Sequence, residues 1–147
     1  MRFARFAAAS AAMTIAVGGF AASASFAGGN PHFMHGSPQY SIADNAVTAS
    51  GSIAGVGKQD ATITLTAEAE VNCLNKGGNM PPGLHKSVSS TPEVVPADKN
   101  GRINFSVTTA QVDASSCPKS MTPIVTFSSA TLTAVIGSVT LTDTHTF

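Results

Sequence analysis

The residues best suited to bind a metal lie together near the start of the chain, in His32, Met34 and His35. Thioether sulfur and imidazole nitrogen together favour copper over harder cations. Pro31 removes a backbone amide that an amino-terminal copper site would use. Gly, Pro and Ser around the three residues predict an irregular backbone without a rigid frame for ligands. They remain candidates only, and the sequence indicates no cofactor.

His85 and His145 are the histidines available for an exported hydrolase. Such chemistry needs an imidazole within hydrogen-bond reach of a serine or carboxylate. The chain has no G-x-S-x-G elbow. A concave pocket holding either histidine beside such a partner would favour the hydrolase, whereas a threonine-covered surface would argue against it. The hydrolase therefore stays an alternative to a binding protein, as does a metal-binding protein that uses the His32–His35 segment.

Glu68 and Glu70 form the one close pair of acids on a strand-like pattern. Their Cα atoms would lie about 6.5–7 Å apart, with both side chains on the same face. Two acids that project in parallel cannot flank a glycosidic bond from opposite sides. The chain also has no Trp to serve as a sugar platform. We therefore interpret the pair as part of a solvated strand face.

Cys73 and Cys117 are the two cysteines of the chain. In an exported protein an even pair predicts a disulfide, here between residues 44 apart. The spacing is not C-x-x-C, and no histidine lies near either cysteine in sequence, which disfavours a redox or metal pair. Cys73 falls on the apolar face of its strand, so we expect the bridge to join two sheets.

The segment that follows Cys73 is the candidate binding surface. It contains Asn75, Lys76, Gly77, Gly78, Asn79, Pro81 and Pro82. Gly, Pro and Asn at this density exclude a helix or strand and predict a loop. Binding residues often lie on loops that a rigid scaffold positions. A plain connection between two strands is the other interpretation, and the sequence does not decide between them.

Alternating patterns predict the strands that would hold these residues. Apolar and polar residues alternate from 61 to 73, the pattern of a half-buried strand. Asn100-Gly101 predicts a hairpin turn leading into the next strand. About seven strands without an amphipathic helix predict a single antiparallel, Ig-like β-sandwich. The other expected strands span 48–56, 85–95 (with an edge or bulge at Pro92), 102–112, 123–136 (with a bend or break at Ser128-Ser129) and 138–146.

The first 27 residues have the build of a secretory signal peptide. Arg2 and Arg5 precede an uncharged apolar run, which ends in small residues suited to cleavage. Removal of 1–27 leaves six basic against eight acidic residues, a net charge of about −2. A mildly acidic domain disfavours a nucleic-acid partner. We expect 28–47 to be a flexible lead-in and 48–147 to be the sandwich, secreted and soluble without a membrane segment.

Several motifs resemble a family of small secreted microbial proteins of unassigned function. These are the C-x-N-x-G-G-x-x-P pattern of residues 73–81, Asn100-Gly101, Ser116-Cys117-Pro118 and the closing V-T-L-T-D of residues 139–143. Gly55-Val56-Gly57 replaces the family's G-L-G, and Ile136-Gly137-Ser138 lacks the aromatic residue that often precedes the last strand. The resemblance implies the β architecture and the disulfide and transfers no catalytic residue. The predicted partner is an extracellular ligand or surface of unknown identity, with the oligomeric state open.

Overall fold

The computed structural model describes residues 29–147, and every regular element in this range is a β-strand. None of its described residues forms a helix of the length and apolarity needed to cross a membrane. The predicted signal peptide, 1–27, lies outside the described residues. The strands are β1 (His32–Phe33), β2 (Gln39–Ala43), β3 (Ala46–Ala54), β4 (Ala61–Leu74), β5 (Leu84–Ser89), β6 (Glu93–Val95), β7 (Arg102–Thr108), β8 (Thr122–Ile136) and β9 (Val139–Thr146).

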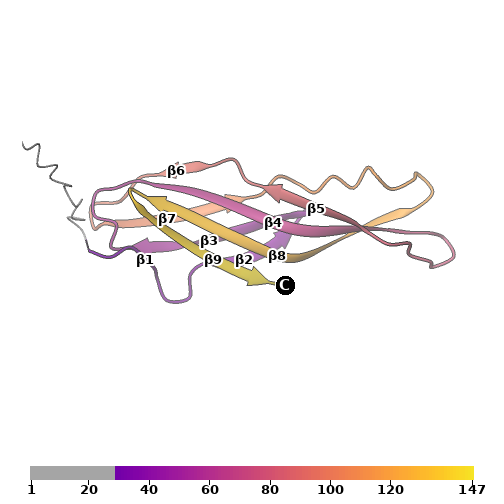
Figure 1. Cartoon of the computed structure of the whole chain (residues 1–147), viewed down its shortest axis with the longest axis horizontal. Coiled ribbons are helices and arrows are strands. Elements are labelled where there is room, and N and C mark those ends of the chain that lie inside the picture. The colour runs from indigo at the N-terminus through magenta and orange to yellow at the C-terminus, as the bar shows by residue number, and fades with distance from the viewer. Residues whose placement is uncertain (1–28) are drawn as a thin grey trace, which may run out of the picture.

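The strands form two antiparallel sheets, which confirms the predicted β-sandwich (Figure 1). In sheet A, β3 pairs with β7 on one side and with β1 and β2 on the other. In sheet B, β4 pairs with β8, and β9 lies outside β8. β5 and β6 both pair with the free side of β4, one after the other. β1 and β2 lie one after the other along the same side of β3, and β5 and β6 along the same side of β4. The nine strands therefore fill about as many places in the two sheets as the seven strands predicted.

The hydrophobic core lies between the sheets and follows the alternation of the strands. On β4, Ile63, Leu65 and Ala67 are fully buried, while the threonines between them face outward. β7 alternates in the same way, with three buried side chains between exposed ones. The apolar side chains of sheet A that complete this core are Val47, Ala49, Ile53, Ile103, Phe105 and Val107.

A β-bulge interrupts the long pairing of β4 with β8 at Ser128. Glu68 pairs with Ser129, whereas Ala69 pairs with Phe127, so Ser128 is the extra residue. Before the bulge the odd-numbered residues of β8 face the core, and after it the even-numbered residues do. Phe127 and Ala130 are therefore both on the core side. The Ser128 carbonyl accepts a hydrogen bond from the N–H of Phe147. The sequence break expected at Ser128-Ser129 is thus a bulge within one continuous strand.

The segment predicted as a flexible lead-in is ordered in its described part, 29–47. It contributes β1, β2 and the first residues of β3 to sheet A. Asp44 and Asn45 both have positive φ, 51° and 58°, which is the conformation of a two-residue hairpin turn. Asp and Asn tolerate this conformation, so this pair was the sequence signal for the β2–β3 hairpin. The Gly and Pro residues between 28 and 38 gave the predicted lead-in as a whole the composition of a flexible segment.

The Asn100-Gly101 turn forms locally, but the expected hairpin does not. Asp98 accepts backbone hydrogen bonds from Asn100 and Arg102, at 2.8 and 2.9 Å, as a reversal requires. The strands on either side then diverge, because β6 pairs with β4 in sheet B and β7 pairs with β3 in sheet A. The residues of a turn specify a change of chain direction. Which strand each neighbour then pairs with depends on the burial of apolar side chains in the core.

Candidate functional site

The candidate binding loop, 75–83, joins β4 to β5 at one end of the elongated molecule (Figure 1). Asn75 organises its first half. The Asn75 side-chain Oδ1 accepts hydrogen bonds from the backbone N–H groups of Gly77 and Asn79, both at 2.9 Å. The Asn75 N–H donates to the Asn79 carbonyl, and the Gly78 N–H donates to the Asn75 carbonyl. The first half of the loop is therefore a closed ring of hydrogen bonds around one asparagine.

The second half of the loop presents side chains to solvent. Met80 is 53% exposed, and Pro81 and Pro82 are also exposed. Two prolines in succession restrict the backbone and reduce the entropy lost when a partner binds. At Gly83 a Cβ atom would collide with the side chains of Glu70 and Asn72, which would have to move for a larger residue to fit there. Lys76, Gly77, Gly78 and Asn79 complete the exposed surface of the loop.

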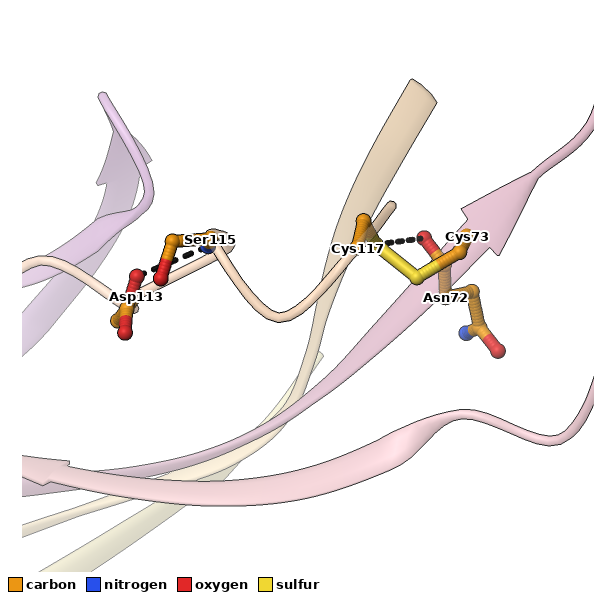
Figure 2. The surroundings of a disulfide bond; sticks show 5 residues. All are labelled: Asn72, Cys73, Asp113, Ser115 and Cys117. Atoms are coloured by element: carbon orange, nitrogen blue, oxygen red, sulfur yellow. Dashed lines mark hydrogen bonds between the residues drawn. A yellow bond between two sulfur atoms is a disulfide. The ribbon is translucent and has the colours of Figure 1, made fainter. Parts of the chain in front are cut away.

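The predicted disulfide, Cys73–Cys117, braces the base of this loop (Figure 2). The two Cα atoms lie 5.5 Å apart, and Cys73 lies near the end of β4. Cys117 does not come from the opposite sheet, as had been expected, but from the segment between β7 and β8. Its Sγ lies 3.8 Å from the carbonyl oxygen of Asn72. The bridge therefore ties a crossing segment to sheet B and leaves sheet A outside the link.

That crossing segment, 109–121, is itself ordered by side-chain and backbone hydrogen bonds. Thr109 is buried, accepts a hydrogen bond from the N–H of Val47, and donates its own N–H to the Val47 carbonyl. Farther along, Asp113 accepts a hydrogen bond from the Ser115 backbone at 2.8 Å (Figure 2). Hydrogen bonds from Ser115 hold the pKa of Asp113 below its ordinary value.

Neither candidate catalytic histidine lies beside a serine or carboxylate partner in a hollow. His85 is exposed on β5, with Glu70 as its Cα partner across the ladder. His145 stacks on Tyr40, with the ring centroids 4.9 Å apart and the planes inclined by 13°. Within residues 29–147, neither imidazole hydrogen-bonds to a serine or a carboxylate. Neither histidine therefore has, in this part of the chain, the serine or carboxylate partner that a hydrolase would need.

Tyr40 and Asp143 form a polar contact between the sheets that sequence reasoning missed. The Tyr40 hydroxyl donates to the Asp143 carboxylate at 2.8 Å, and it lies 3.3 Å from the Asp143 carbonyl. Burial, followed by the hydrogen bond to Asp143 and its charge, raises the pKa of Tyr40. Phe147 packs edge-on to His145, with centroids 4.8 Å apart. The group closes the side of the sandwich where β2 meets β9.

The outer face of sheet B is covered by threonines in cross-strand rows. Register places Thr64 beside Thr133 and Thr133 beside Thr142, and the Thr131 and Thr144 hydroxyls lie 3.2 Å apart. Glu68, on the same face, accepts a hydrogen bond from the Ser87 hydroxyl at 2.7 Å. A threonine-covered surface of this kind argues against the hypothesis of an exported hydrolase. The threonines of this face include Thr62, Thr64, Thr66, Thr122, Thr126, Thr131, Thr133, Thr140, Thr142, Thr144 and Thr146.

The metal candidates His32, Met34 and His35 lie in an ordered turn, contrary to the expected irregular segment. Met34 and His35 line a hollow of about 280 Å³ beside β3, where the turn between β1 and β2 passes. His32 lies on β1, and its Nδ1 is 2.8 Å from the Asn30 carbonyl oxygen. In the described part of the chain, no three His, Cys, Asp or Glu side chains gather as a metal-binding group.

Fold and site together define a class of protein, a β-sandwich with one disulfide. In it β4 and β8 continue past the end of β9 and lead to an ordered, exposed loop. No family model matches the chain, and no curated protein matches it. The chain is similar to a solved structure, the solution structure of R. palustris CsgH, at 15% sequence identity and a TM-score of 0.35. The similarity covers 74% of this chain and 87% of the CsgH chain.

Proposed function

We propose that the protein is an exported, non-enzymatic binding protein that contacts an extracytoplasmic ligand or surface through the loop 75–83. The observation that carries this proposal is the order of an exposed loop. Asn75 closes the first half of the loop, and a disulfide fixes its base. Ordering of this kind before binding reduces the conformational entropy that association would otherwise cost.

The composition of the loop supports a contact surface. Lys76 and Asn79 supply polar groups, and Met80 supplies an exposed apolar side chain on a flexible stem. Methionine adapts its shape to irregular apolar surfaces. Pro81 and Pro82 add rigid apolar surface beside it.

Export of the protein is part of the same proposal. The predicted signal peptide, 1–27, would deliver the chain across a membrane. The Cys73–Cys117 disulfide supports this destination, because disulfides persist in oxidising compartments. The resemblance to a family of small secreted microbial proteins supports it also and remains a prediction.

Binding of the purified protein to arrays of cell-wall polymers and host glycans tests the proposal. In the test variant, Lys76, Asn79, Met80, Pro81 and Pro82 are replaced by Gly and Ser, while Asn75 and Gly83 are kept because they shape the backbone. We expect the variant to lose about tenfold or more in affinity for any polymer that the native protein binds.

The matched control replaces Lys99 and Asn100 with serine in another exposed turn, between β6 and β7. We expect this control to bind as the native protein does. Equal affinity of the loop variant and the native protein would exclude 75–83 as the binding surface. Loss of binding in both variants would assign the effect to general surface chemistry and contradict the proposal equally.

A further inference from the structure

The turn between β1 and β2 is built as a rigid frame, although its Gly- and Pro-rich sequence predicts the opposite. The Met34 N–H donates to the Ser52 carbonyl at 3.0 Å, which extends the β1–β3 ladder by one residue. The Ser37 N–H then donates to the Met34 carbonyl at 2.9 Å and closes a β-turn. Gly36 has a φ of +75°, as the third position of a type II turn requires.

Alternation along β1 places two metal-binding side chains on the same face. Phe33 packs against the core, and its ring centroid is 6.4 Å from that of Phe105. Because neighbouring side chains of a strand point to opposite faces, His32 and Met34 point outward together. Their Cα atoms lie about 6.6 Å apart by the rise of two strand residues.

Met34 and His35 also line one hollow beside β3, and His32 lies next to it on β1. The hollow measures about 280 Å³, and its remaining lining is neutral. Ser37 is turned toward the Ser52 backbone, from whose N–H it accepts a hydrogen bond at 2.7 Å. Besides the His35 imidazole, the polar side chains that line the hollow are hydroxyls and one amide, without a carboxylate. The other lining residues are Gly36, Ser37, Gln39, Ser50, Gly51 and Ser52.

The hydrogen bond of His32 orients its ring as metal-binding histidines are commonly oriented. A carbonyl oxygen can only accept, so the 2.8 Å contact with Asn30 places the proton on Nδ1. The lone pair of the neutral ring then lies on Nε2, directed away from that backbone. Histidines that bind metals usually donate their second ring N–H to a carbonyl or carboxylate in this way.

We propose that Met34, His35 and His32 form a binding site for a soft monovalent cation, Cu(I), beside β3 at the turn between β1 and β2. The thioether of Met34 selects for Cu(I), and the imidazoles are acceptable ligands for it. A hard divalent cation would need oxygen donors, and the hollow contains no carboxylate. The site is separate from the loop 75–83 and does not depend on the proposed function of that loop.

Titration of the purified protein with Ag(I) tests the site. Ag(I) is a soft monovalent cation like Cu(I), but air does not oxidise it to a divalent ion. Cu(I) under a reductant and Zn(II) are the parallel titrations. We expect one equivalent of Ag(I) and of Cu(I) to bind more tightly than Zn(II), with a shift of the Met34 methyl resonance. Affinity for Zn(II) equal to that for Ag(I) would overturn the proposal.

Substitutions with matched controls locate the ligands. We expect Met34→Leu and His35→Asn each to weaken Ag(I) binding by about tenfold or more. Met80→Leu and His85→Asn, which change an exposed methionine and histidine elsewhere, should leave it unchanged. If Met34→Leu binds Ag(I) as Met80→Leu does, the proposal fails.

His32 is tested separately as the third ligand. We expect His32→Asn to weaken Ag(I) binding severalfold, and an unchanged affinity would remove His32 from the site. Met34→Leu leaves every backbone nitrogen in place, so the loss expected of that variant distinguishes this site from chelation by an amino terminus. Circular dichroism of each variant should match the native spectrum, since all three side chains lie outside the core.

Discussion

The pairing of β4 with β8 in sheet B has two halves, a sandwich half and an arm, which are stabilised differently. In the sandwich half, residues 61–67 of β4 pair with 130–136 of β8 and are covered by sheet A. In the arm, residues 69–74 pair with 122–127, beyond the end of β9 (Figure 1). The arm is covered by the segment 109–121, which contributes Val112, Ala114 and Cys117 to the core.

The difference shows what a sheet needs when no second sheet covers it. In the sandwich half, Leu65 and Leu132 are fully buried between two regular layers. In the arm, a segment without strand structure takes the place of the second layer and cannot form a ladder. Its order comes instead from the disulfide and from single hydrogen bonds such as that of Asp113. Apolar burial stabilises both halves, since Val71 and Phe127 of the arm are buried as well, and a covalent link additionally secures the arm.

Removal of the disulfide should have the largest effect on this comparison. With a sequence separation of 44 between the cysteines, the loop-entropy model predicts that Cys73→Ser with Cys117→Ser lowers the free energy of unfolding by about 4 kcal/mol. Urea denaturation measures this loss. Native-state hydrogen exchange should show that amides of 109–121 lose more protection than those of β7. Equal loss in both segments would mean that the disulfide does not act on the arm in particular.

Truncation of the fully buried Leu65 in the sandwich half should cost more than truncation of the half-buried Val125 in the arm. Leu65→Ala removes a fully buried side chain, and we expect a loss of about 3 kcal/mol in the free energy of unfolding. Val125→Ala in the arm removes a half-buried side chain and should cost about 1 kcal/mol. The urea midpoints of the two variants test the ratio. Similar losses would contradict the difference in burial.

Deletion of Ser128 tests the bulge that separates the halves. The pairing of Ala69 with Phe127 and of Glu68 with Ser129 would become continuous, so every inward side chain keeps its face. We expect a loss of about 1 kcal/mol from the hydrogen bond between Phe147 and Ser128. Deletion of Thr126 is the control, since it would turn Val125 to the solvent face. Thermal unfolding should show a clearly larger loss for the control.

The contact between Tyr40 and Asp143 should give the sandwich half a small alkaline sensitivity. The folded state raises the pKa of Tyr40 above the unfolded value of about 10. This contribution to stability is therefore complete below about pH 10 and is lost as the pH rises above it. Tyr40→Phe should lose less stability than the native protein between pH 9 and 11. An identical decline in both would show that other groups cause it.

Local patterns predicted the elements well where one face of a strand is buried. The alternation from 61 to 73 predicted β4 to within one residue of its end, because half-burial imposes a period of two. The strand expected over 85–95 instead divides into β5 and β6, with Ser90 buried between them. The Ser90 hydroxyl accepts the N–H of Leu65 there, a contact between residues 25 apart that no local pattern reports.

The sequence predicted the loop after Cys73, but not the contacts that order the loop and the other candidate residues. Asn75 was recognised as part of a loop, but its role as the hydrogen-bond centre depends on how the loop closes. Tyr40 and Asp143 are separated by 103 positions, and only the meeting of β2 with β9 brings them together. For the same reason, the frame that orders His32, Met34 and His35 was not predicted, since it depends on the ladder with β3.

The amino-acid sequence by itself determined the all-β class, the main strands, the bonded cysteines and the loop after Cys73, because these follow from alternation, composition and turn chemistry. Only the tertiary structure decided which strands are neighbours, why β6 and β7 diverge into different sheets, and what covers the arm. The physical reason is that local chemistry specifies the direction and face of a strand. Its partners are chosen by burial of apolar surface between segments far apart in the chain.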